Sequence, residues 1–286
     1  MILAYFGNKY HQLFLEDYLR EEPGYPPPAI EYISLVGPRY VVLKRLFFSA
    51  WRARKSRAKI FIPLSSAFIY QLAFLITGSS AILYSDGIAD LLDDRPVLYR
   101  AVLRINIAVK FASINSLDQY LSLLARSQPC FIQETLPSGL CKPFVLFNLK
   151  APGHLGQRER TQVLVDSLFL AKAYALKQGL PLLISVHKSA FDCISRKDVS
   201  DICSPVQYAL SYSPIYSHLP SRLCCAFITL ASGAAADAMA LGSGYPIILL
   251  DPGCKFSSII YNKRNEAYLD VLMSSGDKRL GISRLR

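Results

Sequence analysis

Short apolar segments alternate with segments of helical spacing twice along this 286-residue chain, and that alternation constrains its fold most. In the first half the segments predicted as strands are residues 2–6, 29–36, 59–63 and 81–84. Helical spacing of apolar residues lies between them at 10–19, 41–55 and 66–76. Strands and helices in this order favour a parallel sheet covered by helices.

The second half repeats the pattern. Its predicted strands are 144–149, 182–186, a short strand within 201–212, 224–230 and 245–250. Its predicted helices are 158–178, one that starts within 213–218, 232–241 and 266–273, while residues 98–126 form a largely helical end to the first half. We therefore expect an α/β protein of two Rossmann-like domains, 1–136 and 143–286, which face each other across a cleft.

Composition narrows the class of protein. Apolar residues make up 52% and charged residues 19%, which excludes a disordered chain, a collagen or a coiled coil. The excess of 32 Lys and Arg over 21 Asp and Glu favours anionic partners: nucleotides, acidic sugars, nucleic acid or an anionic membrane face. Seven cysteines without a CxxC spacing indicate free thiols in a reducing cytoplasm. Without an apolar run of about 18 residues or a signal-type N-terminus, we expect a cytoplasmic protein, at most peripheral on the inner membrane face.

Ligands of doubly wound sheets bind at the carboxyl ends of the strands, so the residues after each strand are the candidates. Asp86 follows the strand 81–84 and precedes Gly87, where a carboxylate could accept a proton from an attacking hydroxyl. The alternative is an Asp that caps the following turn. His187 follows the strand 182–186, where an imidazole could donate a proton or a hydrogen bond to a leaving phosphate. The alternative is a buried histidine bonded to backbone.

Loop amides and lysines at the same ends suit a nucleotide-activated donor. The candidates for nucleotide-sugar binding are Gly87, Lys150, Pro152, Gly153, Lys188, Ser213, Pro214, Ser232 and Gly233. Ser232 and Gly233 open a helix of small residues, where a phosphate can approach the amides closely and where a serine is also a good N-cap. No HxH, HExxH or CxxC spacing is present, so the sequence predicts neither a metal site nor a cofactor.

Residues 39–59 carry eight Lys and Arg, no acid, and the interleaved rings of Phe47, Phe48 and Trp51. This segment could bind an anionic membrane surface or an acidic glycan. Nucleic acid is not expected, because no nucleic-acid-binding motif accompanies the segment. The alternative is a solvated helix face beside the core.

Several of these motifs together resemble a known family. The segment KIFIPLSSAFIYQLAFLITGSSAILYSDGIADLL (59–92) resembles the N-terminal domain of bacterial sialyltransferases and polysialyltransferases. ISVHK (184–188), SPIYSHL (213–219) and FITLASGAAADAMALGSGYPIILLD (227–251) are similar to the His-Pro and Ser/Thr motifs of that family. The second half also resembles other surface-polysaccharide transferases of the two-domain GT-B type.

The resemblance covers 59–92 and 144–251, and it departs from the family at two positions. Ser85 stands where the acid-acid-Gly motif has its first acid, and Lys188 stands where the His-Pro motif has its proline. The first departure bears on Asp86 as the base, while Lys188 would still suit an anionic donor.

The resemblance implies an inverting, metal-independent transfer of sialic acid from CMP-sialic acid to a glycan hydroxyl. The N-terminal domain would take the acceptor and the C-terminal domain the nucleotide sugar. Asp86 would act as the base and His187 would assist the leaving phosphate. Two alternatives remain: a surface-polysaccharide transferase or epimerase-like enzyme with another nucleotide sugar, and an inactive glycan-binding or scaffold protein on the same fold.

Overall fold

The structure is a computed structural model, and the chain divides into two compact units, Met1–Leu123 and Leu124–Arg286. The described residues are 2–6, 30–34, 38–63, 81–84, 121, 140, 142–152, 155–213, 215–230, 233–251, 270 and 272–284. The expected domain bounds, 1–136 and 143–286, stay a prediction. The cleft between domains also stays a prediction.

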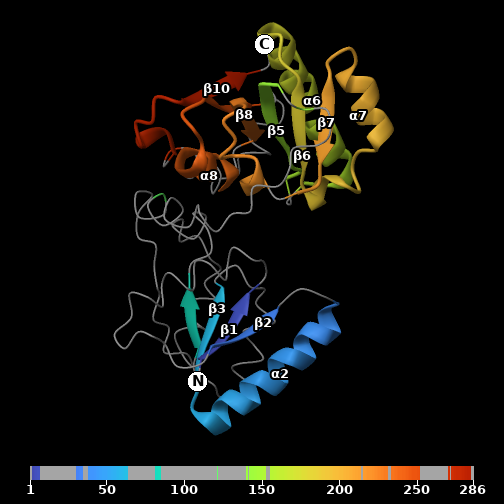
Figure 1. Cartoon of the computed structure of the whole chain (residues 1–286). Helices are drawn as coiled ribbons and strands as arrows, with labels where there is room; N and C mark the ends of the chain where they lie inside the picture. The colour runs from blue at the N-terminus through green and yellow to red at the C-terminus, as the bar shows by residue number, and fades with distance from the viewer. Residues whose placement is uncertain are drawn as a thin grey trace. The chain divides into compact units, whose positions relative to one another are not determined.

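The first unit contains a four-stranded parallel sheet in the order β2-β1-β3-β4 (Figure 1). Its elements are β1 (Ile2–Phe6), β2 (Ile30–Ser34), α2 (Arg39–Ser56), β3 (Lys59–Pro63) and β4 (Ala81–Tyr84). Helix α2 buries Val42, Leu46, Ala50 and Ala53 on one face, at the spacing of an amphipathic helix. The parallel strands expected from the sequence are confirmed, and β3 and β4 have the predicted bounds.

The second unit contains a six-stranded parallel sheet in the order β10-β9-β8-β5-β6-β7. Its strands are β5 (Phe144–Leu149), β6 (Leu182–Val186), β7 (Tyr208–Ser211), β8 (Cys224–Leu230), β9 (Ile247–Asp251) and β10 (Leu280–Arg284). Its helices are α6 (Gln157–Gln178), α7 (Arg196–Cys203) and α8 (Gly233–Leu241), with short 3₁₀ turns η3 (Lys188–Ala190) and η4 (Ile215–Ser217). When the six strands are numbered 1 to 6 along the chain and read across the sheet from β7 to β10, their order is 3-2-1-4-5-6. This is the order of a Rossmann sheet.

The reversal of strand order between β5 and β8 decides which helix covers which face. Right-handed crossovers that lead in opposite directions from the middle of a sheet place their helices on opposite faces. Helices α6 and α7 pack over β5, β6 and β7 in one apolar cluster, which includes Val145, Leu164 and Ile184. Helix α8 packs against β8 and β9, and its residues do not belong to that cluster. The carboxyl ends of β5 and β8 therefore meet at the topological switch point.

The structure corrects the predictions in three places. Helix α7 and the edge strand β10 were not predicted, and the helix expected to start within 213–218 is the single 3₁₀ turn η4. The expected helices at 10–19 and 66–76 lie outside the described residues, as do most of those at 98–126 and 266–273. No helix in the described part of the chain is long and apolar enough to cross a membrane.

Candidate functional site

The switch point of the six-stranded sheet is where a Rossmann-like unit offers a crevice to a ligand. The loop after β5 begins at Lys150, and α8 begins at Gly233 shortly after β8 ends. The backbone N–H of His187, directly after β6, donates to the carbonyl of Leu149 at 3.0 Å. Three segments that the sequence singled out thus converge on one edge of one sheet.

Lys150 and Asp237 form the charged centre of this edge. Asp237 lies in the second turn of α8 and is 3% exposed. Burial lowers the pKa of the Lys150 ammonium, and the Asp237 carboxylate opposes that shift. The Asp237 carboxylate therefore stabilises the charged form of Lys150 at the switch point. Lys150 in turn offsets the cost of burying that carboxylate. Asp237 was not singled out in the sequence, where it is one polar residue in the small-residue segment GAAADAMALG.

His187 is held as a neutral imidazole. Its Nδ1 accepts a hydrogen bond from the backbone N–H of Ser189 at 3.2 Å, which leaves the ring proton on Nε2. Burial, and then the positive charges of Lys150 and Lys188, lower the pKa of His187 to about 4. Near pH 7 this side chain can therefore donate a hydrogen bond from Nε2. Of the two roles expected for it, the geometry favours this one over proton donation.

Ser189 joins the loops after β5 and β6. Its Oγ accepts a hydrogen bond from the Ala151 N–H at 3.1 Å. The single hydroxyl proton has two acceptors in reach, the Ala151 carbonyl at 3.2 Å and His187 Nδ1 at 2.9 Å. Ser189 therefore fixes the His187 ring relative to the Lys150 loop, a role that no sequence pattern indicates.

A row of small polar side chains crosses the sheet just before this edge. Its members are paired in register on neighbouring strands: Thr229 of β8, Asn148 of β5, Ser185 of β6 and Ser211 of β7. All are buried. Asn148 Nδ2 donates to Thr229 Oγ1 at 3.2 Å, and Ser211 Oγ lies 2.7 Å from His218 Nε2.

By strand alternation this polar row faces away from the α6–α7 cluster and toward the side of Lys150. Buried polar groups joined by hydrogen bonds make a rigid floor. Each member is the one polar residue near the end of an apolar strand, but only the register shows that they form a row.

A separate hollow of about 490 Å³ opens on the α7 side of the same edge. Its lining is mostly apolar, with Phe191 and Tyr212 at a centroid distance of 5.7 Å. Arg196 Nε donates to the Tyr212 hydroxyl at 2.8 Å. Leu149 and Val186 line it, so it lies on the opposite face of the sheet from Lys150 and is distinct from the charged edge.

The sequence-predicted site residues divide into two groups. Lys150 and Lys188 both lower the pKa of His187. Ser213 follows β7, and Gly233 is the first residue of α8. Pro152 follows Ala151 in the same loop and is half-buried. The predicted residues outside the described part of the chain are Asp86, Gly87, Gly153, Pro214 and Ser232. Within the described ranges no group of three His, Cys, Asp or Glu side chains is placed to hold a metal ion.

Comparison with known proteins identifies the fold. No protein-family model matches the chain, and no curated protein sequence matches it. Several solved structures are similar to it in fold. Staphylococcus aureus MnaA, in a co-structure with UDP, is 11% identical, with a TM-score of 0.57 over 97% of this chain and 88% of that one. A UDP-GlcNAc 2-epimerase from Neisseria meningitidis, bound to UDP-GlcNAc, is 11% identical, with a TM-score of 0.55 over 96% and 90%.

A putative UDP-N-acetylglucosamine 2-epimerase from Listeria monocytogenes gives a TM-score of 0.56 at 11% identity, over 96% of this chain and 88% of that one. At this identity the likeness establishes the fold alone. The chain is an α/β protein of the GT-B type, with two Rossmann-like units, as the sequence predicted.

Proposed function

We propose that this protein is a nucleotide-sugar enzyme that binds the donor phosphates at the carboxyl edge of β5, β6 and β8. The observation that carries the proposal is that the positive charges of Lys150 and Lys188 both act on His187, while Lys150 also interacts with Asp237 of α8. Two ammonium groups, an imidazole Nε2–H and helix amides together suit a phosphate that gains charge as it leaves.

A nucleoside diphosphate suits this edge better than a monophosphate. Lys150, Lys188 and the amides at the start of α8 are separate donors, enough for more than one phosphate group. The solved structures of the same fold that are named for UDP or UDP-GlcNAc support a UDP-linked donor. CMP-sialic acid, which the motif resemblance implies, is the competing donor.

The reaction we propose is glycosyl transfer with inversion. An acceptor hydroxyl forms a bond to sugar C1 as the bond from C1 to the diphosphate oxygen breaks. The electron pair of that bond leaves with the nucleotide. Lys150, Lys188 and His187 Nε2–H stabilise its new charge, and Gly153, Ser232 and Gly233 supply amides. Asp86, which follows β4 by two residues, accepts the hydroxyl proton.

A panel of nucleotides and a product assay test this function. Isothermal titration should rank UDP above CDP and CMP. With UDP-sugars and a glycan acceptor, proton NMR should show UDP release matched by a new glycosidic anomeric signal. Tight CMP binding with weak UDP binding would instead favour a sialyltransferase. No nucleotide binding at all would favour an inactive glycan-binding protein. Ser85 and Lys188, which depart from the related motifs, are the sequence features that support this alternative.

UDP-GlcNAc 2-epimerisation is the second candidate, because structures named for that activity have this fold over nearly the whole chain. Both reactions break the bond between C1 and the diphosphate, so both can use the same charged edge. The NMR assay separates them: an epimerase changes the C2 configuration of UDP-GlcNAc without an acceptor, and a transferase does not.

A further inference from the structure

Helix α2 of the first unit has two apolar faces, of which only one is needed by the core. The inner face consists of small and aliphatic side chains and is buried against the sheet. The outer face carries four aromatic rings within three turns: Tyr40 is 74% exposed, Phe47 39%, Phe48 62% and Trp51 54%. Single exposed rings are ordinary, but a cluster on one helix face indicates a surface that binds something.

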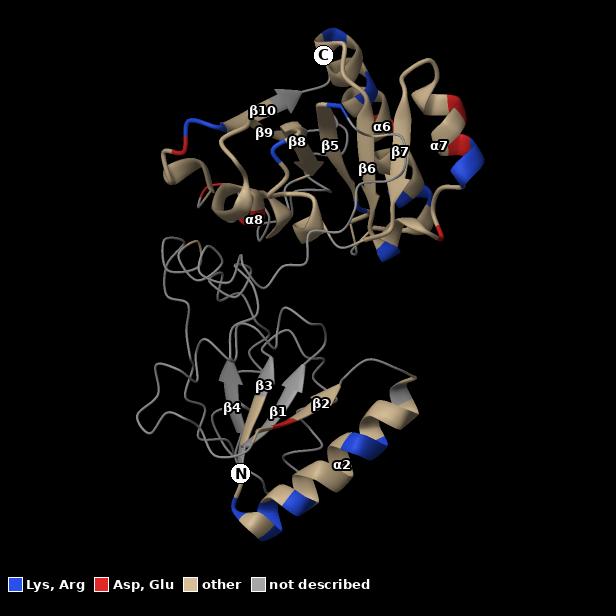
Figure 2. Ribbon diagram, in the orientation of Figure 1, with Lys and Arg blue, Asp and Glu red and all other residues tan. Residues whose placement is uncertain are grey.

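The same outer face is strongly basic. Between residues 40 and 57 the chain has six Lys and Arg and no acid (Figure 2). Lys44 and Lys55 project among the rings by helical spacing, and the Lys55 ammonium lies 3.8 Å from the centre of the Trp51 ring. Cations interleaved with aromatic rings are typical of helices that lie at the boundary between water and an anionic lipid surface.

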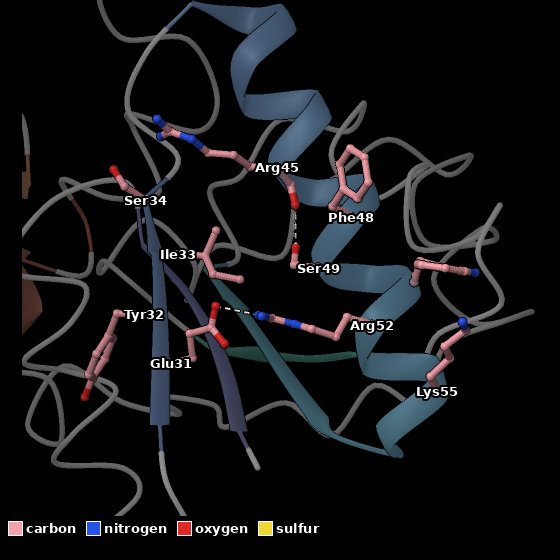
Figure 3. A pocket seen from close by; sticks show the side chains of 10 residues that line it. Glu31, Tyr32, Ile33, Ser34, Arg45, Phe48, Ser49, Arg52 and Lys55 are labelled. Carbon is pink, nitrogen blue, oxygen red and sulfur yellow. Dashed lines mark hydrogen bonds and ion pairs between the residues drawn. The ribbon is translucent and has the colours of Figure 1, made fainter.

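A hollow of about 650 Å³ lies beside this face, between α2 and the edge strand β2 (Figure 3). The α2 side contributes Arg45, Arg52 and Lys55, and the β2 side contributes Glu31 and Ser34. Glu31 accepts an ion-paired hydrogen bond from Arg52, so one of the three cations is neutralised. Arg45 has no ion pair among the described residues and lies across the hollow from Glu31 and Arg52, toward Ser34 (Figure 3). The hollow is therefore sized and charged for an anionic headgroup.

We propose that α2 docks this protein on an anionic phospholipid bilayer. Phe47, Phe48 and Trp51 enter the interfacial layer, Lys44 and Lys55 meet headgroup phosphates, and the hollow beside Arg45 takes one headgroup. A bilayer is favoured over a soluble polyanion because the rings lie together on the exposed face, where a lipid interface would cover them all at once. The proposal does not depend on the reaction that the second unit carries out.

Trp51 is the one tryptophan of the chain, so its fluorescence reports on the proposed contact without a label. The full chain is mixed with phosphatidylcholine vesicles, with and without phosphatidylglycerol. We expect a blue shift of the Trp51 emission, and quenching by brominated lipid, only with the anionic vesicles. The shift should weaken as salt is added, because exposed charges are screened.

Variants locate the contact. Lys44→Glu combined with Lys55→Glu should weaken vesicle binding at least tenfold, and Phe48→Ser severalfold. Lys177→Glu combined with Lys197→Glu is the matched control: both side chains are exposed lysines of the second unit, and this variant should bind as the original does. Circular dichroism and the midpoint of thermal unfolding check that each variant folds.

Three results would overturn the proposal. The first is an unchanged Trp51 emission with anionic vesicles. The second is equal weakening by the control pair. The third is a Trp51 shift with heparin or duplex DNA but no quenching by brominated lipid, which would make the partner a soluble polyanion.

Discussion

At the scale of single residues, the protonation state of His187 decides what the proposed site can do. An imidazole whose pKa is about 4 is uncharged near pH 7, so its place beside two lysines costs no charge repulsion. The Ser189 amide determines which nitrogen keeps the proton. Sequence alone could place His187 at a strand end, but the tautomer depends on a hydrogen bond that only the folded loop makes.

Acid should unfold the protein partly through His187. The pKa of His187 is 6.5 in its ordinary state and about 4 in the folded chain. At a pH between these two values, His187 is protonated in the unfolded chain and neutral in the folded chain. The free energy of unfolding should therefore fall as the pH drops from 6.5 toward 4. His187→Asn should flatten the fall, measured by urea titration over that pH range, and a parallel decline in both proteins would contradict the folded pKa.

Loss of the imidazole donor should affect turnover more than binding. Removing one preformed donor to a developing oxyanion costs on the order of 100- to 1000-fold in turnover. His187→Ala should show a loss of that size, with nucleotide affinity within a few-fold of the original. Steady-state kinetics and calorimetry on the same preparations separate the two effects. A variant that keeps full turnover would remove His187 from the chemistry.

Asp86 is the proposed base, and Ser85 stands beside it where the related motif has a further acid. Asp86→Asn removes the proposed base while keeping the size of the side chain. We expect turnover to fall about 100- to 10,000-fold with donor affinity unchanged. The control is Asp166→Asn, a partly buried surface position on α6. Unchanged turnover in Asp86→Asn would leave the donor site intact and place the base elsewhere.

At the scale of elements, α8 is the part that brings Asp237 and Gly233 to the switch point. Arg279 anchors its carboxyl end: Nη2 donates to the Met239 carbonyl at 2.6 Å and Nη1 to the Gly242 carbonyl at 3.4 Å. Asp277 holds the guanidinium in place through an ion pair of 2.6 Å. A residue just before the edge strand β10 thus positions the helix that faces the proposed ligand.

Replacing Arg279 should therefore destabilise α8 and, through this helix, the proposed site. Arg279→Met leaves helix carbonyls and Asp277 without their donor, which costs about 1–3 kcal/mol of folding free energy. The neighbouring Lys278→Met is the control, since Lys278 is exposed and outside this network. Chemical denaturation should show a lower midpoint for the Arg279 variant alone. Equal midpoints would mean that α8 does not depend on this anchor.

The elements also show where sequence patterns suffice. Strands β3, β5, β6 and β8 were predicted with their observed bounds, because apolar runs between breakers specify buried parallel strands. Helix α7 was missed because RKDVSDIC is short and mostly polar; it depends on the Ser195–Asp198 capping box and on buried Val199. β10 was missed because LGISR is a short edge strand with little apolar pattern.

At the scale of the whole molecule, the doubled alternation of strands and helices was enough to predict two Rossmann-like units. The candidate site was predicted in part. Residues that follow strands, such as Lys150 and His187, could be found by position alone. The polar row through Asn148 and Ser185 could not, since it exists only across strands whose order the sequence does not reveal.

The central claim, that the switch-point edge of the second unit binds a nucleoside diphosphate, is tested most directly by a UDP titration of one altered pair. Lys150→Met alone would leave Asp237 buried without its cation, so it is combined with Asp237→Asn. A charged hydrogen bond is worth roughly 1.5–3 kcal/mol. UDP affinity should therefore fall about tenfold to a hundredfold. The control Lys177→Met, at the far end of α6, should bind UDP as the original does, and equal affinity in all three proteins would contradict the claim.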